Sequence, residues 1–532
     1  MIRLCRVADV RAAEQSALRA GRSEKDLMRD AGSGVAQGIL RERIGRPGAA
    51  LFLVGPGSNG GDGLVAAATL ASQGWQVRIW SHGRNGLAGA PVDDAAASRL
   101  EWLTGSDDLD GALRGADVVV DAVFGVGGRP ELPEPVAWAF RAAWDTRVEQ
   151  GIPMVALDIP SGVDADSGAA DPDAFRADLT LTVGLPKIGL YRGEAVRRAG
   201  RLALVEIGLT APQSSDGEPA LITEGDARRW LPRRSADTHK RQVGTLLVVG
   251  GAPNYYGAPR MAAAAAGRVG AGLVSLAVPR SLIGPISTAL PEATFVPLPE
   301  GEFGGAGSRA ADLVRKAAAE ANALLIGPGL GQDSIVDEFL DAFFGARSST
   351  PGIGFGAARS EAATERFTGR AVVDADGLNW LSRHADWPDR LRGASLVLTP
   401  HPGELGRLLG IDTTEIVERP WESATEAAAR FGQVIVLKHA HTVIAHPDGD
   451  LHIAPQALPS LASAGTGDVL AGTIAGLLAQ GLTTLEAAAC GVYVGTLAAL
   501  AAEATTGTLG LVAPDVIGAT ARAVSSLYDA RW

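Results

Sequence analysis

The sequence predicts an α/β protein with two domains. The chain has 532 residues, whereas a single domain typically has roughly 100–200. Short apolar and β-branched runs alternate with alanine-rich stretches along most of the chain, which is typical of parallel sheets covered by helices on both faces. This alternation lapses over 208–240, where Pro, Ser, Asp and Gly accumulate. We therefore expect a first domain over 1–215, a linker over 216–238 and a second domain over 239–532.

Composition and charge exclude several classes of function. The formal net charge is −12 and no Lys/Arg cluster offsets it, so we expect neither nucleic acid nor a membrane surface as a partner. Two thiols, Cys5 and Cys490, make neither a disulfide framework nor a thiolate metal site and fit a reducing compartment. We see no signal peptide and no apolar run long enough to span a membrane. The sequence therefore predicts a cytoplasmic protein that acts on small molecules.

Several strands are expected in the first half. They are "LFLVG" (51–55), "QVRIW" (76–80), "DVVVDAVFG" (117–125) and "PMVALDIPSG" (153–162). The first is followed by Gly55, Gly57 and Gly60, which satisfy the G-x-G-x-x-G pattern of NAD dehydrogenases. Those enzymes also need an acidic residue about 20 residues on, at the end of the next strand. The first acidic residue after that strand is Asp93, so a dehydrogenase is disfavoured.

Polar residues follow these strands and define a candidate site. Asn59 and Asp62 lie among glycines in a strand-to-helix turn, which suits the close approach of a phosphate-bearing ligand to backbone N–H groups. Asp121, Asp158 and Lys187 follow later strands, and ligands bind outside the carboxyl ends of parallel strands. Alternatively, Asp121 and Asp158 cap helices or turns.

The motifs "GPGSNGGDGLVAA", "VDAVFGVGG", "LDIPSGVDADSG" and "LPKIGL" occur in this order. Over 1–215 the chain thereby resembles the YjeF N-terminal family, the NAD(P)H-hydrate epimerases, which implies a Rossmann-like three-layer αβα fold. The resemblance implies that Asn59, Asp121 and Ser161 bind potassium, and oxygen ligands of this kind suit a hard cation. It also implies a set of hydrate-binding residues: Ser58, Asn59, Gly60, Gly61, Asp62, Gly125, Val126, Gly127, Gly128, Arg129, Pro130, Glu131 and Asp158. Ser58 stands where the family commonly has asparagine.

The same resemblance implies interconversion of the R and S forms of hydrated NADH and NADPH at C6 of the damaged nicotinamide ring. Inversion at this carbon needs a proton donor or acceptor beside it. Asp158 is our candidate, because it is expected at the end of a strand and matches the family.

The second half continues the alternation of strands and helices without repeating the sequence. Strands are expected in "GTLLVVGG" (244–251), "ANALLIGPGLG" (321–331), "RAVVDADGLN" (370–379), "ASLVLTPHPGE" (394–404) and "QVIVLKHAHTVIA" (433–445). Small or polar residues follow each strand, which again indicates a crevice at the carboxyl edge of a sheet. No G-x-x-x-x-G-K-[ST] run occurs, so a P-loop NTPase is excluded. The Gly- and Ser-rich stretch 345–369 is expected to be a loop or a surface insertion.

The segment "SAGTGDVLAG" combines an anion-binding turn with a carboxylate. Backbone N–H groups of Gly465 to Gly467 at a helix start can stabilise a phosphoryl group, and Asp468 can take the proton from an attacking hydroxyl. Alternatively, Asp468 caps the apolar helix that ends near Gly481.

The order of "GPGLG", "VVDADGLN", "TPHPGE" and "AGTGDVLAG" resembles ribokinase-like α/β folds and, more closely, the ADP-dependent NAD(P)H-hydrate dehydratases, over 225–530. The resemblance implies that ADP phosphorylates the C6 hydroxyl of the S-form hydrate, leaving AMP, and that elimination of phosphate restores the dihydronicotinamide. Magnesium is expected with the nucleotide, because it neutralises charge on the transferred group. The implied hydrate contacts are Ala258, Gly329, His401 and Asp468, and the implied nucleotide contacts are Lys438, His439, Ala440, His441, Thr442 and Gly467.

This half departs from the family pattern at two positions. His439 and Arg241 stand where the family usually has glycine, and a side chain at a phosphate-facing turn crowds a nucleotide. The alternative to a hydrate contact at His401 is a histidine of a surface loop without a role in binding.

Both halves together indicate a bifunctional nicotinamide nucleotide repair enzyme, with a homo-oligomer implied by resemblance alone. The alternative is a small-molecule kinase of hydroxymethylpyrimidine or sugar type with a non-catalytic nucleotide-binding N-terminal module.

Overall fold

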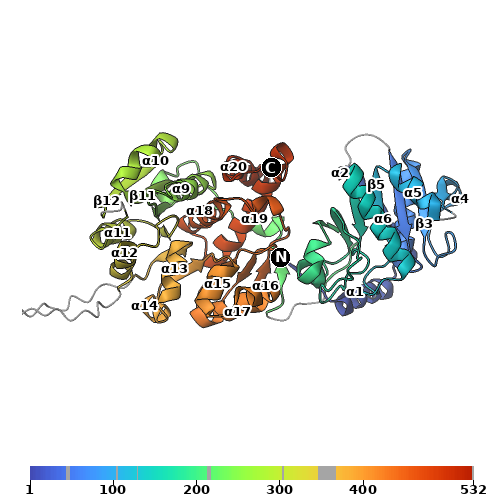
Figure 1. Ribbon diagram of the computed structural model, residues 1–532, viewed down its shortest axis with the longest axis horizontal. Coiled ribbons are helices and arrows are strands. Elements are labelled where there is room, and N and C mark those ends of the chain that lie inside the picture. The colour runs from blue at the N-terminus through green and yellow to red at the C-terminus, as the bar shows by residue number, and fades with distance from the viewer. Residues whose placement is uncertain are drawn as a thin grey trace, which may run out of the picture. The chain divides into compact units, whose positions relative to one another are not determined.

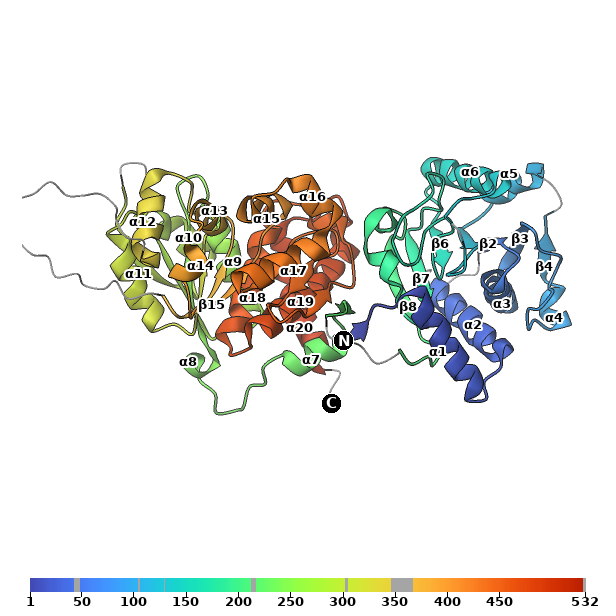
Figure 2. The same ribbon diagram turned by 90° about the horizontal axis from the view of Figure 1, so that it is seen from below.

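The computed structural model describes residues 1–42, 48–103, 106–128, 130–211, 217–301, 305–345 and 367–529. The chain forms two compact units: a first unit, Ile2–Glu218, and a second unit, Pro219–Trp532 together with Met1 (Figures 1 and 2). Each unit has its own apolar core, since the buried core residues of the first end at Ile207 and those of the second begin at Ile222. The predicted two-domain α/β organisation is confirmed.

The first unit is a parallel sheet between two layers of helices. Its strands run in the order β4-β3-β2-β5-β6-β7-β8, and all neighbouring pairs are parallel. The strands are β2 (Ala49–Val54), β3 (Gln76–Ser81), β4 (Leu100–Trp102), β5 (Val118–Ala122), β6 (Met154–Leu157), β7 (Leu179–Val183) and β8 (Arg201–Val205), preceded by the short β1 (Ile2–Arg3). The helices are α1 (Val7–Arg19), α2 (Glu24–Glu42), α3 (Ser58–Ser72), α4 (Asp94–Ala97), α5 (Ser106–Arg114), α6 (Glu134–Gln150), η1 (Ile188–Tyr191) and η2 (Gly193–Arg197).

Strand β2 shows how the layers arise. Successive side chains of a strand point to opposite faces. Phe52 accordingly packs with residues of α2 and α3, whereas its neighbour Leu51 packs with residues of α5 and α6. The strand order reverses between β2 and β5, and ligands of such sheets bind at the carboxyl ends of the strands where this reversal occurs. The Rossmann-like three-layer architecture therefore places a crevice beside the glycine-rich turn after β2.

The second unit is built on a mixed sheet. Its strands run in the order β9-β18-β17-β16-β15-β14-β13-β10-β11-β12, and β17 is antiparallel to both β16 and β18. The strands are β9 (Ala220–Leu221), β10 (Thr245–Val249), β11 (Leu273–Pro279), β12 (Thr294–Leu298), β13 (Ala323–Ile326), β14 (Arg370–Val373), β15 (Ser395–Leu398), β16 (Val434–Leu437), β17 (Val443–Ala445) and β18 (Leu451–Ile453). The order reverses between the parallel neighbours β10 and β13, which marks a second crevice.

Helices cover this sheet (Figure 2). They are α7 (Glu224–Trp230), α8 (Lys240–Val243), α9 (Gly257–Arg268), η3 (Arg280–Leu282), α10 (Ile283–Ala289), α11 (Ala310–Ala319), α12 (Ser334–Phe344), α13 (Asp376–Arg383), α14 (Trp387–Arg390), α15 (Pro402–Leu409), α16 (Thr413–Glu418), α17 (Pro420–Phe431), η4 (Pro459–Leu461), α18 (Thr466–Ala479), α19 (Thr484–Thr506) and α20 (Ala513–Asp529).

Helix α18 packs against α9 through glycines. A Cβ atom added to Gly472 would lie 2.1 Å from the Ala262 carbonyl oxygen, and one added to Gly476 would lie 2.9 Å from Ala266 Cα. Such a close approach of two backbones requires residues without side chains. The contact fixes α18, whose first turn contains Asp468, against the helix that follows β10.

Helix α19 is long and apolar enough to cross a membrane by length and composition alone, although the sequence predicted no uninterrupted apolar run of that length. An 18-residue window of α19 has mean hydropathy 1.6, and 67% of that window is buried inside the protein. Helices α7, α18 and α20 pack around it. Glu486 and Glu503 near its ends interrupt the apolar run in the sequence. The apolar surface of α19 is that of a core helix.

Where the sequence predicted a linker, over 216–238, the structure has a strand and a helix of the second unit. From Pro219 onward the chain belongs to the second unit, because β9 pairs with β18 and Thr223 caps α7. The reciprocal hydrogen bonds of Thr223 and Asp226 form a capping box, a signal that the loop-like composition concealed. Within the expected insertion over 345–369, residues 346–366 lie outside the described residues.

Candidate active sites

Asp121, at the end of β5, is one of the three predicted potassium ligands in the first unit. It is fully buried, and its Oδ2 and Oδ1 accept hydrogen bonds from the backbone N and the Oγ of Ser161, each at 2.7 Å. The backbone N of Val123 donates to Oδ1 at 3.0 Å. The bond from Val123 is a local turn cap, whereas Ser161 is distant in sequence. Asp121 therefore does more than cap a turn.

Asn59, the third predicted ligand, borders the same loop. A Cβ atom added to Gly125 would lie 3.1 Å from Asn59 Oδ1, and the neighbouring Phe124 N donates to Ser161 Oγ at 2.8 Å. Asn59 Nδ2 is buried and has no hydrogen-bond partner among the described residues. Burial raises the pKa of Asp121 to about 7, although the hydrogen bonds that it accepts oppose the rise. A buried carboxyl, a hydroxyl and an unsatisfied amide suit a hard cation.

Asp158 and Lys187 form a buried ion pair after β6. Lys187 is 1% exposed, and its Nζ donates to Asp158 Oδ1 and to the Val183 carbonyl oxygen. The backbone N of Val183 donates to the same Asp158 oxygen at 3.0 Å. Asp158 has a φ of 70°, a left-handed conformation that is uncommon for residues other than glycine and clusters at functional sites. One carboxylate is thus held rigidly at the edge of the sheet.

Asp62, in α3, faces other charged groups of this site. Burial raises the pKa of Asp62 well above its usual range, and Asp158 and Glu14 raise it further. The sequence did not suggest Glu14, which belongs to α1, or Arg84, whose Nη1 donates to the Gly57 carbonyl oxygen at 2.9 Å. Arg84 follows β3, so its position after a strand was an available signal.

The remaining predicted hydrate contacts of the first unit lie on two loops. Gly128 N donates to the Gly125 carbonyl oxygen at 2.8 Å, which closes the turn after β5, and Arg129 lies outside the described residues. Ser58 and Glu131 are exposed. The Ser58 hydroxyl is therefore available to a ligand although it departs from the family pattern.

In the second unit, two turns meet where the strand order reverses. Gly329 follows β13 and has a φ of 64°. A Cβ atom added there would lie 2.5 Å from the Tyr255 carbonyl oxygen and 3.1 Å from Ala258 Cβ. Ala258 is in the first turn of α9. The structure therefore brings together Ala258 and Gly329, two of the predicted hydrate contacts.

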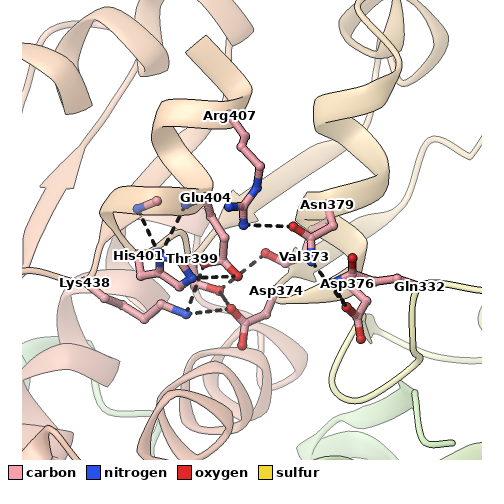
Figure 3. A network of polar contacts seen from close by, with 11 residues as sticks. Gln332, Val373, Asp374, Asp376, Asn379, Thr399, His401, Glu404, Arg407 and Lys438 are labelled. Atoms are coloured by element: carbon pink, nitrogen blue, oxygen red, sulfur yellow. Dashed lines mark hydrogen bonds and ion pairs between the residues drawn. The ribbon is translucent and has the colours of Figure 1, made fainter. Parts of the chain in front are cut away.

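Figure 3 shows a polar network at the carboxyl ends of β14, β15 and β16. Lys438 Nζ donates to Asp374 Oδ1 at 2.9 Å and lies 3.8 Å from Glu404 Oε2. Thr399 Oγ1 donates to the same Asp374 oxygen at 2.8 Å. A Cβ atom added to Gly467 would lie 3.6 Å from Lys438 Nζ, so the ammonium also lies beside the start of α18.

The Lys438 ammonium group thus interacts electrostatically with the carboxyl groups of Asp374, Glu404 and Asp468. Burial raises the pKa of Asp468 to about 7, with a further rise from Asp374 that Lys438 opposes. Burial likewise raises the pKa of Glu404 to about 7. Burial alone would lower the pKa of Lys438, but Asp374 and Glu404 outweigh it and the pKa is raised. Lys438 therefore stays charged. With a pKa of about 7, Asp468 and Glu404 can each gain or lose a proton near neutral pH.

Asp468 does not cap its helix. The N-cap of α18 is Gly465, with a φ of 87° and no capping side chain. Within the described part of the chain, no hydrogen bond engages the Asp468 carboxylate. The structure gives no support to the capping alternative and leaves this carboxylate free to accept a proton.

His401 is the N-cap of α15. Its Nδ1 accepts hydrogen bonds from the backbone N of Gly403 at 3.0 Å and of Glu404 at 3.3 Å, and its own backbone N donates to Glu404 Oε2 at 2.8 Å. Burial lowers the pKa of His401, and Lys438 lowers it further. The ring is therefore neutral and carries its proton on Nε2, so it is more than a plain loop histidine.

The two histidines of the predicted nucleotide loop add no positive charge at neutral pH. His441 is 3% exposed, and its Nδ1 lies 2.9 Å from the Ala454 carbonyl oxygen. Burial lowers the pKa of His441 to about 4 and also lowers the pKa of His439. Lys438 is then the positively charged group of this loop.

Two family models match the chain. The model of the YjeF-related protein N-terminus matches residues 24–189, and the model of NAD(P)H-hydrate dehydratases matches residues 246–522. A bifunctional NAD(P)H-hydrate repair enzyme of Salinibacter ruber is 36% identical in an alignment of 532 positions. The alignment covers 94% of this chain and 92% of that protein. The chain belongs to the family of bifunctional NAD(P)H-hydrate repair enzymes.

Other relatives carry the same name. The bifunctional NAD(P)H-hydrate repair enzyme of Escherichia coli is 32% identical, over 89% of this chain and 85% of that protein. Among solved structures, an ADP/ATP-dependent NAD(P)H-hydrate dehydratase from Bacillus subtilis, co-crystallised with ATP and Mg²⁺, is 30% identical with a TM-score of 0.47, covering 58% of this chain and 98% of that chain. The two family models and these relatives confirm the resemblance of both halves that the sequence indicated.

Several polar residues of the candidate site in the second unit were not predicted from the sequence. Asp374, Thr399 and Glu404 lie within the motifs "VVDADGLN" and "LTPHPGE", and their position after strands was the signal that could have found them. Asp376, which accepts a hydrogen bond from Gly331 N at 2.8 Å, lies in the same motif. Ala375, between the two aspartates, has a φ of 48°, a strained conformation of the kind found at functional sites.

Proposed function

We propose that the second unit dehydrates the S form of hydrated NADH or NADPH at the expense of ADP, giving NAD(P)H, AMP and phosphate. The observation that carries this proposal is Asp468, in the first turn of α18, whose carboxylate accepts no hydrogen bond from the described residues and whose pKa is raised by burial to about 7. Asp468 takes the proton from the C6 hydroxyl as that oxygen attacks the β-phosphorus of ADP, and the bond to AMP breaks. Backbone N–H groups of Gly465 to Gly467 stabilise the transferred phosphoryl group.

The remaining residues of this site bind and orient the hydrate and the nucleotide. Ala258, Gly329 and His401 contact the hydrate in this proposal, with the neutral His401 Nε2–H as a donor. Lys438 and Gly467 contact the phosphates of the nucleotide, and His439, Ala440, His441 and Thr442 contribute backbone atoms.

Magnesium bound with the nucleotide supplies charge neutralisation on the transferred group. The described residues contain no group of three or more metal-ligating side chains suited to an ion. Mg²⁺ usually keeps several waters and binds through one or two carboxylates and substrate phosphates. Asp374 and Glu404, the acidic partners of Lys438, are the side chains that would hold it.

For the first unit we propose epimerisation of the R and S hydrates, with Asp158 transferring a proton at C6. The ion pair with Lys187 orients the Asp158 carboxylate. Potassium would be held by Asn59, Asp121 and Ser161, whose donor set fits a hard cation. It would neutralise the buried Asp121 and fix the turns that carry the predicted hydrate contacts.

The test is recovery of dihydronicotinamide absorbance by the purified full-length chain from mixed R and S NADH hydrate with Mg²⁺ and K⁺, in parallel with ADP and with ATP. We expect full recovery of both epimers. Recovery of only the S share would contradict the epimerase. A stable phosphorylated product without recovery would instead favour the small-molecule kinase. A homo-oligomer and a cytoplasmic location stay predictions.

A further inference from the structure

The chain just before helix α1 is hydrogen-bonded to the segment that carries Lys187. Cys5 N donates to the Pro186 carbonyl oxygen at 2.8 Å, and Ile188 N donates to the Cys5 carbonyl oxygen at 2.9 Å. These bonds hold the chain before α1 on both sides of Lys187. The start of α1 is therefore fixed with respect to the Asp158–Lys187 pair.

The inner face of α1 also packs on this segment. Val10 and Ala13 are buried in a cluster with Leu185. Glu14 follows Ala13 directly and lies one helical turn after Val10, so it shares their side of the helix. Glu14 is half-buried. Glu14 therefore lies on the side of α1 that packs against the segment carrying Lys187.

Charged groups from several elements face Glu14. Burial raises the pKa of Glu14, Asp158 raises it further, and Lys187 and Arg11 oppose the rise. Glu14 in turn raises the pKa of Asp62. Arg11 Nη2 lies 3.8 Å from the position of a Cβ atom added to Gly127. Helix α1 therefore borders both the ion pair and the predicted hydrate-binding loop after β5.

Inversion at C6 by loss and re-addition of water takes two proton transfers, one on each face of the ring. A donor protonates the C6 hydroxyl, which leaves as water with the C–O electron pair while the ring nitrogen lone pair forms a C=N bond. Water then adds to the other face, its oxygen bonds to C6, the C=N pair returns to nitrogen, and an acceptor takes the proton. The donor ends deprotonated and the acceptor protonated, which readies the pair for the reverse inversion.

We propose that Glu14 is the second proton-transfer group of the epimerase site and works with Asp158 on the opposite face of the hydrated ring. Asp158 follows β6 of the sheet, and Glu14 lies on α1, whose inner face packs with Leu185 beside Lys187, so the two carboxyl groups come from different elements. The inference rests on the proposed epimerase function of the first unit.

The test follows R-hydrate recovery by the full-length chain with ADP, Mg²⁺ and K⁺, after subtraction of the rate without enzyme. We expect Glu14→Gln to lower kcat for the R form by about 10²- to 10⁴-fold, the usual contribution of general acid–base catalysis, with little change in KM. Dehydration of the S form should be unchanged. Glu14→Asp should restore part of kcat, and Gln15→Ala, at an exposed neighbour on α1, should match the wild type.

A pH profile separates proton transfer from a structural role. Measured as the initial loss of the R form without ADP, so that the dehydratase does not contribute, the wild-type kcat should fall on both the acid and the alkaline side, and Glu14→Gln should lose one limb. Wild-type R-form kcat in Glu14→Gln would overturn the proposal, as would equal losses in Glu14→Gln and Glu14→Asp together with a lowered Tm. Failure of the wild-type chain to recover the R form would overturn the proposed epimerase function instead.

Discussion

At the scale of single residues, the raised pKa of Asp468 sets the pH dependence of the dehydratase step. A base must be deprotonated to accept a proton, and the pKa of Asp468 is about 7. We expect kcat for the S hydrate to fall about tenfold for each pH unit below 7, the slope of a single titrating group. Asp468→Asn should lower kcat by about 10²- to 10⁴-fold while ADP binding, measured by calorimetry, persists. A flat acid limb in the wild type would contradict this assignment.

Lys438 sets the pH at which the acid limb of this kcat profile lies. Lys438 lowers the pKa of Asp468, so Lys438→Met should raise this pKa and move the acid limb to higher pH. At a fixed pH below the new midpoint, kcat should fall about tenfold for every pH unit by which the midpoint moves up. The profile is measured at saturating ADP, which removes any effect on nucleotide affinity, and Lys438→Arg retains the charge as a control. An unmoved limb in Lys438→Met would show that the ammonium does not act on Asp468.

Asp121 links stability to pH and potassium. Its pKa is raised to about 7 in the folded chain and lies near 4 when unfolded, so the folded state binds more protons between these values. Stability of the first unit without K⁺ should therefore fall as pH rises from about 4 to 7, by an amount on the order of a few kcal/mol. K⁺ should restore it. Tm measured in KCl and in tetramethylammonium chloride checks this, and Asp121→Asn should abolish both dependences.

At the scale of elements, the contact of α18 with α9 is sensitive to a single methyl group. Gly472→Ala would bring a Cβ atom to 2.1 Å from the Ala262 carbonyl oxygen, and overpacking of this kind typically costs about 1–3 kcal/mol. Gly495→Ala, in α19, is the matched control, because the nearest atom to its added Cβ is Leu470 Cδ1 at 3.9 Å. It should stabilise by about 0.5–1 kcal/mol. Urea unfolding measures both; an unchanged midpoint in Gly472→Ala would show that the helices can separate.

Elements and their ends were more predictable from the sequence than the partners of side chains. Alternating strands and helices predicted the sheets, strand-end positions predicted Asp121 and Asp158, and a glycine-rich helix start predicted Asp468. The pairing of Lys438 with Asp374 was not predictable, because it joins the ends of β14 and β16, which are far apart in the sequence. Glu14 carries no local motif at all, and only the packing of α1 reveals it.

At the scale of the whole molecule, the two units have separate cores and should respond to different ligands. We expect two thermal transitions in calorimetry. ADP with Mg²⁺ should raise only the one that Gly472→Ala lowers, and KCl should raise only the other. A ligand at 100 times its Kd adds about 2.7 kcal/mol, enough to separate the transitions. One transition that moves with both ligands would contradict independent folding.

The left-handed backbone of Asp158 has a consequence for mutational scanning. With a φ of 70°, position 158 accepts glycine and asparagine with little strain and penalises branched residues. In a library selected for abundance, Asn should survive beside Asp, because its amide oxygen can still accept a hydrogen bond from Lys187 Nζ, whereas Gly leaves that buried ammonium unpaired. Selection for repair of the R hydrate should retain Asp alone. The difference between the two enrichment profiles would separate what the backbone demands at this position from what the chemistry demands.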